Sequence, residues 1–175
     1  SPGVRRSERA TVMKWLLDLG NTRCKSAQWS AGYLAQPQAA DCDLASVGRV
    51  LDQLAPAAMP LAIWISSVAG EAANAAVQAW CASRGWPAPR FVRSQAESLG
   101  VRCAYADPSR LGVDRWMVVL AAAATGRNAL IVDAGTACTI DAVTADGSHL
   151  GGLILPGVAL ARASLNQRTQ FQADV

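Results

Sequence analysis

Two short segments, far apart in the chain, place an aspartate, a glycine and a small polar residue directly after an apolar run. They are residues 18–22 (DLGNT) and residues 133–136 (DAGT). A glycine has no side chain, so backbone N–H groups beside it can approach phosphate oxygens. An aspartate at a strand end can hold a divalent cation, usually through water. Two copies of this pattern indicate two lobes that hold one nucleotide phosphate tail between them, as in a split phosphotransferase.

Each copy also has a purely structural interpretation. The first can be an Asn-containing β-hairpin turn, with Lys25 on the next strand pointing into solvent. The alternative is that Lys25 reaches a phosphate oxygen. The second copy can be a simple strand turn, although its match to the first favours a phosphate-binding role for Gly135 and Thr136.

A third segment places two adjacent charges, Asp114 and Arg115, at the start of an apolar, Ala-rich stretch. In one interpretation Asp114 is a first-turn acid that favours the helix dipole, and Arg115 extends its charge to solvent. In the other, Asp114 accepts or orients a hydroxyl proton for in-line attack, and Arg115 binds an anionic substrate or the transferring phosphate. The segment by itself does not decide between them.

The elements around these residues follow a repeated order. Hydrophobic patterning and turn residues predict strands over 14–19, 24–29, 32–36, 61–66 and 90–93. They predict helices from an N-cap at Asp43 to 54, over 70–84, and from Pro108 to 125. A second three-strand opening is expected over 128–133, 137–144 and 150–155, followed by a helix after Gly157.

The order β-β-β-α-β-α-β-α is that of the ribonuclease-H-like lobe of actin-like ATPases and sugar kinases. The predicted fold class is therefore α/β, with two related lobes built on mixed sheets. We expect a flexible arm over 1–12, a first lobe over 13–126, and the truncated start of a second lobe over 127–175, because a complete lobe needs on the order of 100 residues.

Composition limits the remaining possibilities. The chain of 175 residues is 51% hydrophobic and 17% charged, with net charge +3, as expected for an ordinary globular protein. Three early arginines are too few to favour a nucleic-acid partner, and no apolar run reaches the roughly 20 residues of a membrane span. Five cysteines without a C-x-x-C pair fit reduced thiols in the cytoplasm. The single histidine, His149, is expected to be exposed in a turn.

Four motifs together resemble the type III pantothenate kinase family. They are DLGNTRCK from residue 18, YADPSRLGVDRW from 105, DAGTACTID from 133 and GGLILPG from 151. The resemblance covers residue 13 to the end. It implies an actin-like kinase that phosphorylates pantothenate with ATP, the first step of coenzyme A biosynthesis. It also implies Mg²⁺, a monovalent cation (K⁺ or NH₄⁺) and a homodimer.

The resemblance also implies individual roles. Asp114 would be the proton acceptor, Asp133 the monovalent-cation ligand, and Asp18 a Mg²⁺ ligand, possibly through water. Residues implied to contact ATP are Asp18, Leu19, Gly20, Asn21, Thr22, Arg23, Cys24, Lys25, Gly135 and Thr136. Residues implied to bind pantothenate are Tyr105, Gly112, Val113, Asp114 and Arg115.

Two other functions stay open. One is an accessory transcription-regulatory protein on the same scaffold, against which the intact Asp114–Arg115 pair and both glycine loops argue. The other is a different actin-like small-molecule kinase or ATPase. Such proteins share the two hairpins but not the segment 105–116, which is why pantothenate is the preferred acceptor.

Overall fold

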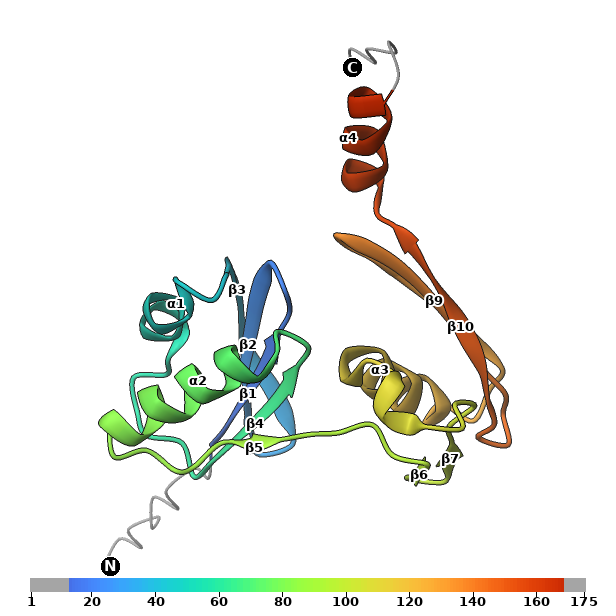
Figure 1. Cartoon of the computed structure of the whole chain (residues 1–175). Coiled ribbons are helices and arrows are strands. Elements are labelled where there is room, and N and C mark those ends of the chain that lie inside the picture. Colours follow the sequence, from blue (N-terminus) through green and yellow to red (C-terminus); the bar gives the residue numbers. More distant parts are fainter. Residues whose placement is uncertain (1–12, 169–175) are drawn as a thin grey trace, which may run out of the picture. The chain divides into compact units, whose positions relative to one another are not determined.

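The computed structural model describes residues 13–168, so the predicted arm over 1–12 lies outside the described residues. The chain forms two compact units, Ser1–Val92 and Arg93–Val175 (Figure 1). The lobe boundary predicted after residue 126 stays a prediction.

The first unit is built on a five-stranded mixed sheet in the order β3-β2-β1-β4-β5. The central strand β1 is antiparallel to β2 and parallel to β4, as the sequence pattern of a three-strand meander followed by a crossover requires. The strands are β1 (Lys14–Leu19), β2 (Arg23–Ser30), β3 (Tyr33–Asp41), β4 (Ala62–Ser67) and β5 (Arg90–Phe91).

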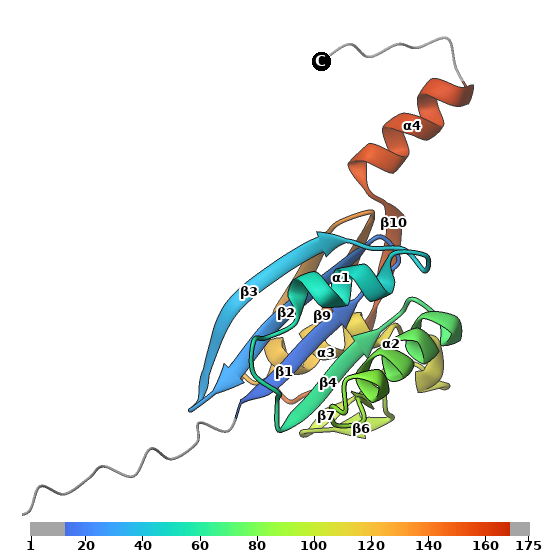
Figure 2. The same ribbon diagram turned by 90° about the vertical axis from the view of Figure 1, so that its left-hand side faces the viewer.

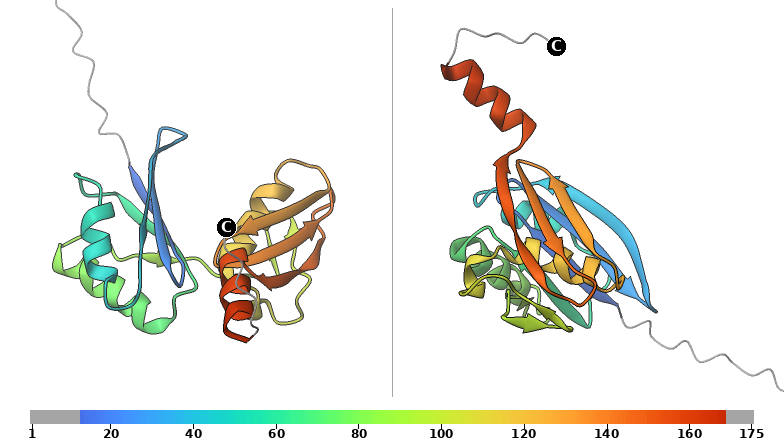
Figure 3. Two further views of the ribbon diagram at one scale, coloured as in Figure 1. Left: turned by 90° about the horizontal axis from the view of Figure 1, so that it is seen from above. Right: turned by 90° about the vertical axis from the view of Figure 1, so that its right-hand side faces the viewer.

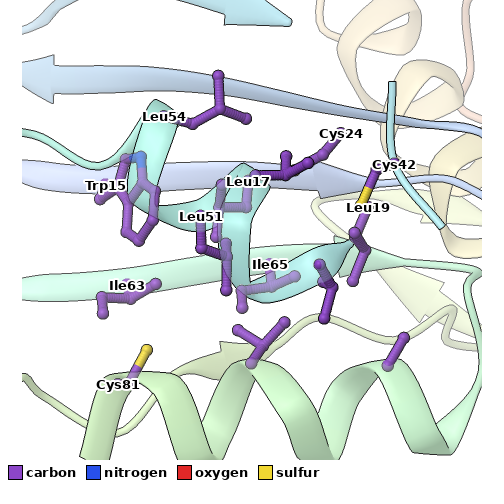
Figure 4. Close-up of a cluster of buried hydrophobic side chains, with 14 residues drawn as sticks. Trp15, Leu17, Leu19, Cys24, Cys42, Leu51, Leu54, Ile63, Ile65 and Cys81 are labelled. Atoms are coloured by element: carbon purple, nitrogen blue, oxygen red, sulfur yellow. The ribbon is translucent and has the colours of Figure 1, made fainter. Parts of the chain in front are cut away.

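Helices α1 (Val47–Leu54) and α2 (Glu71–Ser83) both cover the same face of this sheet (Figures 2 and 3). Trp15, Leu17 and Leu19 alternate along β1 and are buried beneath these helices. Figure 4 shows the resulting cluster, with Ile63 and Ile65 of β4 beside them. The alternation leaves Asp18 on the other face of β1, so the same strand builds the core and presents a candidate site residue.

The second unit contains an antiparallel sheet in the order β10-β9-β8. Helix α3 (Val113–Ala123) packs on β8 and β9 through Trp116, Val119 and Leu120. The strands are β8 (Ala129–Ala134), β9 (Ala137–Val143) and β10 (His149–Pro156), and α4 (Val158–Arg168) follows them. A short hairpin, β6 (Glu97–Ser98) and β7 (Val101–Arg102), precedes α3.

Two predicted helix starts are wrong. The helix expected from Pro108 is a 3₁₀ turn, η1 (Pro108–Arg110), and α3 begins only at Val113, because Leu111 and Gly112 are extended (ψ 122° and 132°). Asp43 does not cap α1, which begins at Val47. The Asp43 carboxylate instead accepts hydrogen bonds from the Ser46 backbone N–H (2.8 Å) and hydroxyl (2.7 Å), closing a turn before the helix.

Candidate active site

The first glycine loop is the tight connection between β1 and β2. The Gly20 N–H donates to the Arg23 carbonyl at 2.9 Å, and a Cβ at Gly20 would lie 3.1 Å from that carbonyl oxygen. Asp18 and Lys25 are cross-strand partners, with Lys25 Nζ 3.5 Å from Asp18 Oδ2. Buried Leu19 and Cys24 anchor the turn, and Asn21, Thr22 and Arg23 are exposed around it.

The second glycine loop connects β8 and β9 in a similar way but with a shorter turn. The Gly135 N–H donates to the Ala137 carbonyl at 2.9 Å. Asp133 lies opposite Thr139 and is exposed, two positions before its glycine, as Asp18 is in the first loop. Gly157 packs on this turn, because its N–H donates to the Thr136 carbonyl at 3.0 Å. The shared placement of Asp18 and Asp133 confirms the hairpin geometry, whereas their phosphate and cation roles stay predictions.

The segment that carries Asp114 and Arg115 forms the first turn of α3. Asp114 is half-buried, and its Oδ1 accepts the backbone N–H of Arg115 at 2.8 Å. A carboxylate in the first turn is stabilised by the helix dipole. Gly112 is the N-cap and Val113 is buried, so the backbone that carries Asp114 is fixed at one side by the core.

An open cavity of about 430 Å³ lies in the second unit and is lined by four residues that precede α3 in the chain: Tyr105, Ala106, Asp107 and Arg110. The Asp107 carboxylate accepts hydrogen bonds from the Ser109 N–H (3.0 Å) and hydroxyl (2.7 Å). These bonds lower the pKa of Asp107 below its usual value. The cavity therefore offers an aromatic ring, an ionised carboxylate and a guanidinium to an acceptor molecule.

Arg115 does not point freely into solvent. It is only 4% exposed, and it forms a bidentate ion pair with Asp141 of β9. Arg115 Nε donates to Asp141 Oδ2 at 2.8 Å, and Nη2 donates to Oδ1 at 2.7 Å. Hydrogen bonding to Asp141 raises the pKa of Arg115. The interpretation of Arg115 as a side chain reaching solvent is therefore wrong. Any contact with an anionic substrate is limited to the Nη1 side, which lies 3.4 Å from the Tyr105 hydroxyl.

The expectation that His149 is an exposed turn residue is also wrong. His149 begins β10, is 4% exposed, and has Nε2 3.0 Å from Asp141 Oδ1. Sequence reasoning assigned no role to either His149 or Asp141. The alternation of β9 carried a signal for Asp141, since Val143, two residues further on, is also buried.

The first glycine loop belongs to one compact unit, and the other candidate residues belong to the second. The convergence of the two loops on one triphosphate accordingly stays a prediction. No cluster of three or more His, Cys, Asp and Glu side chains suited to a metal occurs within residues 13–168. The half-buried carboxylate of Asp18 fits Mg²⁺, which typically takes one or two carboxylates plus substrate phosphates and water, and the exposed carboxylate of Asp133 offers oxygen ligands to a monovalent cation. Within the same residues, no helix is long and apolar enough to cross a membrane.

Comparisons with solved structures show the fold. A protein from Campylobacter jejuni, described as a conserved putative Baf family transcriptional activator, matches 92% of this chain and 64% of its own, with 23% identity and a TM-score of 0.54. The ethanolamine utilization protein EutJ from Carboxydothermus hydrogenoformans matches 89% of this chain and 57% of its own, with 14% identity and a TM-score of 0.51. Together with the mixed sheet and the paired glycine hairpins, these matches place the chain in the actin-like class of α/β proteins, as predicted.

The family follows from sequence comparisons. A family profile described as type III pantothenate kinase matches residues 15–173. The type III pantothenate kinase of Thiobacillus denitrificans is 42% identical over 156 residues, covering 88% of this chain and 61% of the relative. That of Xanthomonas oryzae pv. oryzae is 40% identical over 159 residues, covering 90% and 63%. The chain belongs to the type III pantothenate kinase family, and it spans about three fifths of the length of these relatives.

Proposed function

We propose that the protein containing this chain phosphorylates pantothenate with ATP, giving 4′-phosphopantothenate. The observation that carries the proposal is the family match over residues 15–173, which includes all four motifs. The geometry supports it, because Asp114 occupies the first turn of α3 and both glycine loops follow strand-end aspartates.

In this proposal the protein contributes mainly position and charge. Asp114 orients the primary hydroxyl of pantothenate toward the γ-phosphorus and accepts its proton. The acceptor site includes the open cavity that Tyr105 lines. It is shaped by Tyr105, Gly112, Val113 and Arg115. Phosphoryl transfer needs little covalent chemistry from a protein, so correct placement of the hydroxyl accounts for most of the rate gain.

The two glycine loops would contact ATP through residues 18–25 and through Gly135 and Thr136. Lys25 sits beside Asp18, so it can meet a phosphate oxygen while Asp18 holds Mg²⁺ through water. Mg²⁺ would neutralise charge on the phosphates, and Asp133 would hold K⁺ or NH₄⁺. The protein would act as a homodimer in the cytoplasm, with no nucleic-acid partner. The five cysteines, all unpaired, fit that compartment.

The test is ADP release by the purified protein with and without pantothenate, in Mg²⁺ and K⁺. Release that requires pantothenate supports the kinase. ATP hydrolysis at a constant rate without pantothenate would instead indicate an ATPase, and no hydrolysis with binding to transcription components would indicate the regulatory alternative. Omitting K⁺ or Mg²⁺ in turn tests the two cations separately.

Asp114→Asn tests the central role. We expect kcat to fall by on the order of 100-fold or more, because the amide cannot accept the hydroxyl proton. Folding should be preserved, because the described hydrogen bond of this side chain is to its own helix. Glu71→Gln is the matched control, since it removes a first-turn acid from α2 instead. Near-normal turnover of Asp114→Asn would remove Asp114 from the role.

A further inference from the structure

A buried polar network joins three elements of the second unit. Arg115 comes from α3, Asp141 from β9 and His149 from β10, and all three are at most 4% exposed. Asp141 accepts two hydrogen bonds from Arg115 (2.8 and 2.7 Å). His149 Nε2 lies 3.0 Å from the same carboxylate. Every charge in this network thus has a hydrogen-bonded partner, which a buried ion pair needs to be tolerated.

The pattern of partners fixes the form of the His149 ring. Nδ1 accepts the backbone N–H of Ala104 at 3.4 Å, so this nitrogen carries no proton. The proton then belongs to Nε2, which donates to the Asp141 carboxylate. His149 therefore links Asp141 directly to the backbone next to Tyr105.

The same ring contacts Tyr105 itself. The rings of His149 and Tyr105 are nearly parallel, with an interplanar angle of 7° and centroids 6.2 Å apart. Arg115 Nη1 lies 3.4 Å from the Tyr105 hydroxyl. Tyr105 is thus held from two sides by members of the network, and it lines the open cavity.

The network also reaches Asp114. The backbone N–H of Arg115 donates to Asp114 Oδ1 at 2.8 Å. Because the Arg115 side chain is clamped on Asp141, the peptide that holds the Asp114 carboxylate is fixed against β9. A shift of Arg115 would therefore move Tyr105 and Asp114 together.

A strand irregularity makes this arrangement possible. His149 pairs with Val143 and Gly152 pairs with Asp141, with a register shift between His149 and Gly151. Regular alternation would place residues 149 and 152 on opposite faces of β10. The bulge, in which Gly151 adopts φ +99°, brings both to the face that carries Asp141.

We propose that Asp141 and His149 are positioning residues that hold Tyr105 and the start of α3 in the geometry that binds the acceptor alcohol. This proposal rests on the proposed kinase function, in which the acceptor alcohol is the hydroxyl of pantothenate. Neither residue touches the reacting atoms in this account. Asp141 acts through Arg115, and His149 acts through Asp141, Ala104 and Tyr105.

Two variants separate the contributions. Asp141→Asn keeps the shape of the side chain and removes the charge that Arg115 grips. His149→Phe keeps an aromatic ring against Tyr105 and removes the Nε2 donor. Asp146→Asn is the matched control, because Asp146 is an exposed aspartate on the turn between β9 and β10, bonded to Thr144 and Ser148.

The measurements are KM for pantothenate, KM for ATP and kcat per folded protein, together with amide hydrogen exchange. For Asp141→Asn we expect the pantothenate KM to rise or kcat to fall by roughly tenfold or more, with the ATP KM within about twofold of the parent. Amides of residues 104–105 and 113–116 should exchange roughly tenfold faster. Asp146→Asn should match the parent in all of these.

Unchanged pantothenate kinetics and unchanged local exchange in both variants would overturn the proposal. So would a uniform rise of exchange across the second unit, since that indicates general destabilisation. If Asp141→Asn does not fold, His149→Phe decides. If the parent shows no pantothenate-dependent ADP release, the proposed function fails, while the exchange data still show whether Asp141 and His149 hold the walls of the cavity.

Discussion

Replacing Gly152 by alanine should destabilise the second unit far more than most glycine substitutions. Gly152 lies directly opposite Asp141 in the β9–β10 ladder. A Cβ built on it would lie closer than 3.0 Å to the Ile140 carbonyl oxygen, to Asp141 Oδ1 and to Arg115 Nη2. The Ile140 carbonyl belongs to the sheet backbone and cannot move cheaply, and the other two atoms form the buried ion pair.

The size of the effect follows from these contacts. Forcing an extra methyl group into a packed site costs about 1–3 kcal/mol. Removing one partner of a buried ion pair costs about 3–5 kcal/mol, which is an upper bound for displacing Arg115 from Asp141. Since the strand can relieve the clash only by moving away from Ile140 or by displacing Arg115 from Asp141, we expect a loss of about 2–4 kcal/mol in the free energy of unfolding.

Urea denaturation measures this loss as a lower midpoint at unchanged slope. Gly48→Ala is the control, because a Cβ there meets nothing within 4 Å in helix α1, and we expect a gain of up to about 1 kcal/mol. A Gly152→Ala midpoint indistinguishable from the parent would refute the account of β10 packing. It would also show that the Arg115–Asp141 contact is looser than described.

Two further predictions concern thiol chemistry and acid stability in the first unit. Burial raises the pKa of Cys24 to about 12. Iodoacetamide at pH 8 should therefore leave Cys24 unmodified in the folded protein while it labels the partly exposed Cys138. Peptide mass spectrometry measures the labelling at each cysteine, and labelling of Cys24 before Cys138 would contradict the prediction. The Trp80 indole N–H, followed by Arg84, lowers the pKa of Asp52. The stability that this lowered pKa contributes to the folded state is present above the unfolded pKa of about 3.9. It is lost as pH falls through the pKa of Asp52 in the folded protein. Asp52→Asn should accordingly lower the melting temperature at pH 7, with the difference from the parent shrinking on acidification; a difference independent of pH would contradict the assignment.

The sequence predicted most elements because their hydrophobic patterns are local. The run 14–19 is short and mostly apolar, and 70–84 has helical spacing; they appear as β1 and α2 within one or two residues. The glycine hairpins were equally predictable, since an aspartate and a glycine at a strand end require little beyond the turn itself. Helix starts were harder to predict. Asp43 and Pro108 are strong start signals, but each belongs to a separate short turn, and α1 and α3 begin only at Val47 and Val113.

The network of Arg115, Asp141 and His149 was beyond sequence reasoning for a different reason. Its three members come from three elements, and a bulge in β10 sets which face His149 occupies. A period of two, counted from Gly152, places His149 on the wrong face. Only the pairing register reveals that the single histidine is buried against a carboxylate.

This register also explains why the fourth motif accompanies the other three. Gly152 lets β10 pass close to Arg115 of the second motif and Asp141 of the third. Gly157 does the same at the other end of the strand, where a Cβ would lie closer than 3.0 Å to the carbonyl oxygens of Gly135 and Thr136. A side chain at either position would push β10 away from the α3 start or from the second glycine loop. The glycines of GGLILPG therefore act as close-packing positions that tie Asp114 and Gly135 to one strand, so that the acceptor site and the second phosphate loop of the proposed kinase keep a fixed relation within the second unit.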